Sequence, residues 1–122
     1  MPTIDDILLT ARDGLQRLAA SEVAAEVAAG AVLVDIRPAA QRTHEGEVAE
    51  ALIIERNVLE WRCDPASDAR VAEAVDHDVR WIVLCSQGYT SSLAAASLQQ
   101  LGLHRATDVI GGYQALRALD DD

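Results

Sequence analysis

The stretch WIVLCSQGYTSS at residues 81–92 decides the fold that the sequence predicts. Residues 81–84 form an apolar run without alternation, which is typical of a strand buried on both faces. Residues 91–101 have helical character and an alanine-rich centre that permits close packing on a sheet. The loop between them contains Gly88, whose backbone can curl freely. The thiol of Cys85 is therefore expected between the carboxyl end of a strand and the start of a helix, where open α/β sheets bind ligands.

Strands and helices alternate along most of the chain. Four stretches are predicted to be strands: residues 31–34, 51–54, 81–84 and 107–110. Helices are predicted around them: from Ser21 to a stop at Gly30, over residues 91–101, and over residues 113–119. This alternation is typical of a parallel sheet with helices on both faces.

The connections are less regular. They are predicted as a polar stretch at residues 40–50, helix fragments and loop at 57–70, and one or two helical turns at 71–75.

A separate amphipathic helix is predicted at the N-terminus, from Thr3 to Leu18. Thr3 followed by Asp6 resembles a capping box, and apolar residues then follow at helical spacing. We assign residues 1–20 to this helical extension and residues 21–122 to the main domain. The apolar stripe of the N-terminal helix must be buried, either over an edge of the fold or against a second protomer.

Composition restricts the partners. The chain has 122 residues, which favours one domain, and a net charge of −10 from 10 basic and 20 acidic residues. This charge disfavours nucleic acids and anionic membrane surfaces as partners. Two cysteines cannot build a disulfide framework, and no apolar run is long enough to span a membrane. We expect reduced thiols and a cytoplasmic location.

The Cys85 loop is where chemistry is expected. Its backbone N–H groups and the positive end of the following helix dipole would surround whatever is bonded to the sulfur and stabilise negative charge there. The alternative is that Cys85 is only a small buried apolar residue, but its position in a strand, loop and helix pattern favours a functional role. The three histidines, His44, His77 and His104, lack metal-ligand spacing, so neither a metal nor a cofactor is predicted.

Several segments together resemble a single-domain rhodanese, from about Ser21 to Leu119. The matching segments are VDIR at residues 34–37, GEVAEA at 46–51, the loop at 85–91, and GGYQA at 111–115. The resemblance implies a three-layer α/β/α fold with a small, mostly parallel sheet of about four to five strands. It also implies a sulfurtransferase in which Cys85 takes sulfur from a donor such as thiosulfate or 3-mercaptopyruvate and passes it to a thiophilic acceptor through a persulfide. The loop residues expected to bind the substrate and the persulfide are Ser86, Gln87, Gly88, Tyr89, Thr90 and Ser91.

The loop departs from the family in its charge. Many members carry Arg at the positions of Ser86 and Thr90, so a dianionic donor would lose a charge-assisted contact worth about 1.5–3 kcal/mol. Arg56 or Arg62 could replace that contact, although a solvated surface position is the more common state. The related phosphatases and arsenate reductases need Cys-x5-Arg, and this sequence has Ser91 at that position, which disfavours phosphatase activity.

Other residues are given structural interpretations. The resemblance favours structural roles for Asp35 and Arg37, with Asp35 bonding loop amides and Arg37 pairing with an acid. Cys63 is interpreted as an incidental thiol, although it could also resolve a persulfide into a disulfide. Two aromatic residues, Trp61 and Tyr113, are predicted to pack, and Tyr89 is predicted to shape the mouth of the pocket.

Two functional hypotheses remain open. The first is a sulfurtransferase whose partners are a small sulfur donor and a thiol acceptor. The second is a persulfide carrier or interaction module with little turnover of free donors, which the uncharged loop favours. A homodimer or a sulfur-relay protein partner is compatible with either.

Overall fold

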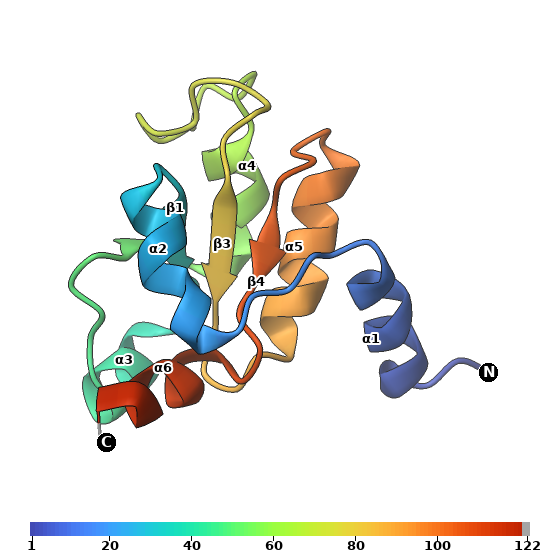
Figure 1. Cartoon of the computed structure of the whole chain (residues 1–122). Coiled ribbons are helices and arrows are strands. Elements are labelled where there is room, and N and C mark those ends of the chain that lie inside the picture. Colours follow the sequence, from blue (N-terminus) through green and yellow to red (C-terminus); the bar gives the residue numbers. More distant parts are fainter. Residues whose placement is uncertain (121–122) are drawn as a thin grey trace.

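The structure, a computed structural model, describes residues 1–120 and contains a four-stranded sheet in which all strands are parallel (Figure 1). The sheet order is β2-β1-β3-β4. The strands are β1 (Val32–Asp35), β2 (Leu52–Ile53), β3 (Trp81–Leu84) and β4 (Thr107–Asp108). The predicted α/β class, the parallel sheet and its size are confirmed.

Helices connect the strands and cover the sheet. The α-helices are α1 (Ile4–Asp13), α2 (Val23–Ala28), α3 (Ala39–Glu45), α4 (Leu59–Cys63), α5 (Thr90–Gln100) and α6 (Gly112–Asp120). Two short 3-10 helices precede α2 and α4: η1 (Ala20–Glu22) and η2 (Arg56–Val58). The carboxyl ends of the strands point towards α3 and α6, which lie beyond that edge in Figure 1.

Each face of the sheet has its own apolar core, because alternate strand residues point to opposite faces. Val34 and Val83 face a core with Leu59 and Leu98, so α4 and α5 cover this side. The opposite face carries the other strand residues with apolar side chains of α2 and α6: Leu33, Ile82, Leu84, Val23, Val27, Tyr113 and Leu116. These two cores make the three-layer α/β/α arrangement.

The N-terminal helix is shorter than predicted. Thr3 caps α1 through the expected capping box, but the helix ends at Asp13, with Gly14 as its C-cap, instead of at Leu18. Leu18 is buried and pairs in parallel with Val109, where its backbone N–H donates to Asp108 O at 3.0 Å. The sequence prediction extended the helix to Leu18 because Leu18 continues the apolar pattern. A buried leucine in an extended segment fits that pattern as well as a helical one does. The division of the chain at residue 20 remains a prediction.

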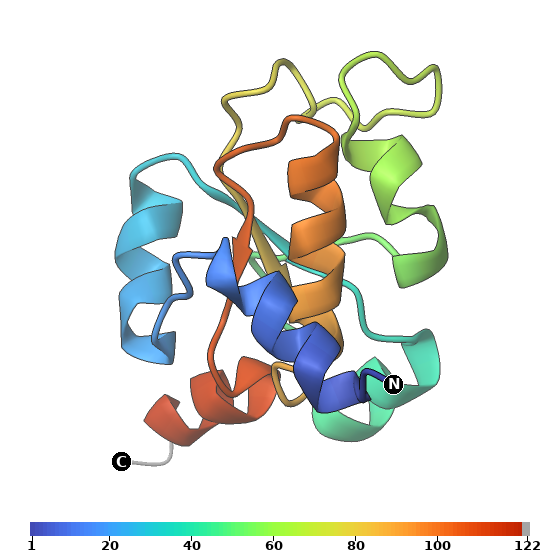
Figure 2. The same cartoon turned by 90° about the vertical axis from the view of Figure 1, so that its right-hand side faces the viewer.

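Helix α1 packs against α5 of its own chain, as Figures 1 and 2 show. The apolar side chains of α1 differ in burial: Leu8 is buried, whereas Ile4 and Leu9 are exposed.

Two connecting segments differ from their predictions. The polar stretch at residues 40–50 contains most of α3, which has no apolar stripe to reveal it. Residues 71–75 form turns and no helix. The predicted helix start at Ser21 also differs. Ser21 lies inside η1, α2 begins at Val23, and Glu22 accepts a hydrogen bond from the N–H of Ala19 at 2.8 Å.

Candidate active site

Cys85 lies directly after β3, where the chain turns towards α5. The residue is 5% exposed, and its Sγ accepts a hydrogen bond from the backbone N–H of Gly88 at 3.2 Å. The loop therefore turns one of its backbone N–H groups onto the sulfur. An N–H group aimed at sulfur stabilises negative charge on it.

Two glycines permit this curl. Gly88 has φ +84°, and a Cβ there would lie 2.8 Å from the N of Gly111 and 2.9 Å from the O of Val109. Gly112 has φ +58°, and its Cβ would lie 2.5 Å from the O of Cys85. Both positions combine a left-handed backbone with a close approach of another chain segment, so only glycine fits them.

The start of α6 holds the loop from below. The N–H of Tyr113 donates to Cys85 O at 2.8 Å, and that of Gln114 donates to Ser86 O at 3.0 Å. The GGYQA segment entered the sequence analysis only through the family resemblance. In the structure its N–H groups hold the backbone of Cys85 and Ser86 in place.

Two arginines of the N-terminal segment hold the loop from behind. Arg12 and Arg17 each donate from Nη2 to the carbonyl oxygen of Gly88, at 2.8 and 2.9 Å. Arg17 also pairs with the fully buried Asp108, with Nε to Oδ1 at 2.8 Å. The peptide carbonyl that follows the sulfur-facing N–H is thus oriented by two cations outside the pocket.

Asp108 organises the other side of this arrangement. The hydroxyls of Ser91 and Ser92, in the first turn of α5, both donate to its Oδ2, at 2.8 and 2.7 Å. Sequence reasoning missed Arg12, Arg17 and Asp108. No local pattern distinguishes these two arginines from the other eight, and Gly88 lies 76 and 71 residues away from them.

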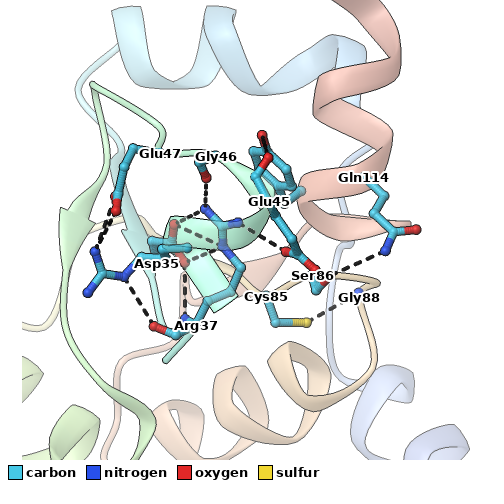
Figure 3. Close-up of polar contacts among 11 residues, drawn as sticks. Asp35, Arg37, Glu45, Gly46, Glu47, Cys85, Ser86, Gly88 and Gln114 are labelled. Carbon is cyan, nitrogen blue, oxygen red and sulfur yellow. Dashed lines mark hydrogen bonds and ion pairs between the residues drawn. The ribbon is translucent and has the colours of Figure 1, made fainter. Parts of the chain in front are cut away.

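A second ionic network lies on the open side of Cys85 (Figure 3). Arg37 is fully buried and pairs with Asp35, with Nη2 to Oδ2 at 2.7 Å, and with Glu45, with Nη1 to Oε1 at 3.1 Å. Glu45 in turn accepts a hydrogen bond from the Ser86 hydroxyl at 2.8 Å. The Tyr113 ring lies 4.1 Å from the Arg37 guanidinium carbon.

Two members of this network, Glu45 and Arg37, have pKa values shifted so that the charged form is favoured. Burial opposes ionisation of Glu45, but the hydrogen bond from Ser86 and the pairing with Arg37 outweigh it and lower the pKa of Glu45. Burial also opposes the charge of Arg37, while its bonds to Asp35 and Glu45 leave its pKa raised. Arg37 therefore acts as a buried counterion of two carboxylates.

A hollow of about 350 Å³ opens beside the sulfur, and we call it the Cys85 hollow. Its lining consists of Ile36, Arg37, Pro38, Gln41, Glu45, Cys85, Ser86, Gln87, Tyr89, Thr90 and Gln114. The structure thus brings together most of the predicted loop with Arg37. Tyr89 is 57% exposed and lies at the lining, near the Arg12 guanidinium.

Four predicted residues lie elsewhere. Asp35 sits behind Arg37, and Ser91 is fully buried against Asp108. Arg56 pairs with Glu60 at 2.9 Å, and Arg62 donates to Ala69 O. Neither Arg56 nor Arg62 lines the Cys85 hollow, so neither supplies the cation that the loop lacks.

Trp61 and Cys63, two residues apart, differ sharply in burial. Trp61, predicted to pack, is 60% exposed, whereas Cys63 is fully buried in the core under α4. Burial, with a contribution from the Glu60 carboxylate, raises the pKa of Cys63 to about 12. Tyr113 is buried as predicted, and its hydroxyl donates to Glu45 O at 2.8 Å.

We expect iodoacetamide to alkylate the folded protein at Cys85 but not at Cys63 near neutral pH. A thiol with a pKa of about 12 and no exposed surface offers almost no thiolate. Peptide mapping by mass spectrometry distinguishes the two sites, and alkylation of both in denaturant is the control. Equal labelling of Cys63 in the folded protein would contradict its placement in the core.

These features define a class of protein: a parallel α/β domain with a cysteine at the carboxyl edge of its sheet, whose sulfur accepts a hydrogen bond from a backbone N–H of the following loop. The sequence family described as "Rhodanese-like domain" matches residues 19–119, and the chain belongs to this family. The comparison with curated proteins gave no match.

Three solved structures illustrate the similarity. The first is a Rhodopseudomonas palustris protein of unknown function described as a possible tyrosine phosphatase. It is 26% identical with a TM-score of 0.87, and the alignment covers 98% of this chain and 92% of that one. The human single-domain sulfurtransferase is 23% identical, with a TM-score of 0.69 and coverage of 87% and 96%. A rhodanese homologue of Thermus thermophilus is 20% identical, with a TM-score of 0.60 and coverage of 83% and 100%.

The described part of the chain shows neither a metal-binding cluster nor a membrane-spanning helix. Within residues 1–120, no group of three or more histidine, cysteine, aspartate or glutamate side chains is arranged to hold a metal ion. None of the helices described there has the length and apolar character needed to cross a membrane.

Proposed function

We propose that the chain is a sulfurtransferase that moves sulfur from a small donor to a thiol acceptor as a persulfide on Cys85. The donor types suggested by the family resemblance are thiosulfate and 3-mercaptopyruvate. The observation that carries the proposal is the position of Cys85 Sγ, 3.2 Å from the N–H of Gly88 inside a curled loop beside an open hollow. Membership of the rhodanese-like family supports it.

The reaction has two halves. The Cys85 thiolate attacks the outer sulfur of the donor, the bond from that sulfur to the rest of the donor breaks, and the leaving group departs with the electron pair. The thiol acceptor then attacks the terminal sulfur of the persulfide and releases the Cys85 thiolate. Backbone N–H groups of the loop and the start of α5 stabilise the anionic sulfur in both halves, as an oxyanion hole does for oxygen.

Steady-state transfer tests this proposal. We expect wild-type protein to transfer sulfur from at least one donor to cyanide, measured as thiocyanate, and Cys85→Ala to lose this activity entirely. Cys63→Ala is the matched control, because it removes the other thiol without touching the Cys85 hollow. Retained transfer by Cys85→Ala would exclude the proposed mechanism.

A second candidate is a persulfide carrier or interaction module with little turnover of free donors. It is favoured by the hollow, in which the one cationic side chain, Arg37, is already paired with two carboxylates. Efficient turnover of thiosulfate or 3-mercaptopyruvate by the isolated protein would exclude this candidate.

Phosphatase activity is not supported by the loop. A Cys-x5-Arg site would place a guanidinium at position 91, where this chain has a fully buried serine bound to Asp108. Arg12 and Arg17 cannot substitute through the contacts they make, because their guanidinium groups bind the outer carbonyl of Gly88. A phosphate dianion would therefore lack the planar donor pair that such enzymes use.

A further inference from the structure

The charges around the Cys85 hollow are unbalanced. Two of its lining residues carry a formal charge, Arg37 and Glu45. Arg37 pairs with Glu45 and also with Asp35 directly behind it, so one cation meets two carboxylates. The network beside the sulfur thus has a net charge of −1, and the Glu45 carboxylate is its part that reaches the hollow.

We propose that Glu45 selects the sulfur donor by charge, disfavouring dianions such as thiosulfate and favouring persulfides of uncharged or amine-bearing thiols. This inference rests on the proposed function, since it concerns the donor of the same site. Glu45 is a specificity-determining residue in this account, because it repels or attracts the part of the donor that leaves.

The hydrogen-bond directions support this selection. The Ser86 hydroxyl donates its proton to Glu45 Oε2 at 2.8 Å and accepts from Gln114 Nε2 at 3.3 Å. Its only proton is therefore committed to the carboxylate and is not offered to an anion in the hollow. Figure 3 shows Glu45, Ser86 and Gln114 as a connected row above Cys85. A donor meets a carboxylate and neutral polar groups at the place where a dianion needs cations.

The positive charges of the loop do not offset this repulsion. Arg17 is paired with the buried Asp108, and Arg12 binds Ser92 Oγ and Gly88 O. Both lie behind the loop and are absent from the lining of the hollow. The backbone N–H of Gly88 and the N-terminal end of α5 remain as the means of stabilising anionic sulfur, and they suit the single charge of a persulfide.

The step with such a donor is balanced. The Cys85 thiolate attacks the terminal sulfur of R–S–S–H, an S–S bond forms to Cys85, and the S–S bond of the donor breaks. The leaving thiolate R–S⁻ takes up the proton of the transferred sulfur, which leaves an anionic Cys85 persulfide and R–S–H. No external oxidant or reductant is needed.

Donor competition with charge variants tests the inference. The rate of Cys85 persulfide formation is measured by quenching and intact mass with thiosulfate, 2-mercaptoethanol persulfide and cysteamine persulfide. We expect wild type to react faster with both persulfides than with thiosulfate. Glu45→Gln should raise the ratio of the thiosulfate rate to the 2-mercaptoethanol persulfide rate about tenfold, because it removes one like charge near the dianion.

Two further variants make the test specific. Glu47→Gln is the matched control, since Glu47 pairs with Arg42 and does not line the hollow, and it should leave the ratio unchanged. Thr90→Lys adds a cation at an exposed lining position without touching the Arg37 network, and it should raise the ratio as well. High salt should raise the wild-type thiosulfate rate and reduce the effect of Glu45→Gln.

The outcomes separate the two levels of the account. An unchanged ratio in Glu45→Gln, or a wild type that prefers thiosulfate, would overturn charge selection by Glu45 while leaving the proposed function intact. Failure of these three donors and of 3-mercaptopyruvate to add sulfur to Cys85 would overturn both.

Discussion

Arg17→Met is expected to destabilise the protein by about 3–5 kcal/mol, a large part of the stability of a small domain. Asp108 is fully buried and has Arg17 as its ion-pair partner, with Nε to Oδ1 at 2.8 Å. The hydroxyls of Ser91 and Ser92 would remain on Oδ2 but bring no charge. Removal of Arg17 thus leaves a buried carboxylate without its counterion. Urea unfolding followed by circular dichroism measures the loss.

Two companion variants test the reason for this loss. Arg80→Met is the matched control, because Arg80 pairs with the partly exposed Glu26, and it should cost about 1 kcal/mol or less. Adding Asp108→Asn to Arg17→Met should recover part of the stability by removing the unpaired charge. A cost for Arg17→Met no greater than that for Arg80→Met would show that Asp108 does not depend on this pair.

Gly112→Ala is expected to reduce sulfur transfer about 100-fold or more, by displacing the Cys85 loop. The added Cβ would lie 2.5 Å from Cys85 O, 2.8 Å from Gly88 N and 2.9 Å from the carbonyl carbon of Ser86. These are backbone atoms of the segment that cradles the sulfur, so they cannot rotate out of the way. The single-turnover rate of Cys85 persulfide formation measures the effect.

Gly30→Ala controls for backbone conformation alone. Gly30 has φ +108°, but a Cβ there meets no atom within 4 Å. We expect a stability loss of about 1 kcal/mol from the unfavourable φ and full sulfur transfer. Wild-type transfer by Gly112→Ala would contradict the close packing of the GGYQA segment under the loop.

The parts of the structure predicted from sequence are those with a strong local pattern. β3 follows from the unbroken apolar run at residues 81–84, and the position of Cys85 follows from the strand, glycine-containing loop and helix around it. Helix α3 could not be predicted in this way. Its residues, AAQRTHE, include no buried side chain and give no helical apolar stripe.

The contacts that complete the site depend on the tertiary fold. The chain has ten arginines, and the sequence around Arg12 does not show that it contacts the Cys85 loop. The packing of α1 against α5 brings Arg12 to Gly88. The placement of Glu45 beside Cys85 likewise follows from its pairing with Arg37. The sequence around Arg56 and Arg62 does not reveal their partners either, and the structure shows that these partners lie away from the Cys85 hollow.

The most direct test of the central claim is the intact mass of the reduced protein before and after incubation with sulfur donors. The donors are thiosulfate, 3-mercaptopyruvate and 2-mercaptoethanol persulfide, each with wild type and with Cys85→Ala. We predict a gain of one sulfur atom by wild type with at least one donor, lost on treatment with cyanide, and no gain by Cys85→Ala. No gain with any donor, or the same gain without Cys85, would contradict a sulfurtransferase that works through this cysteine.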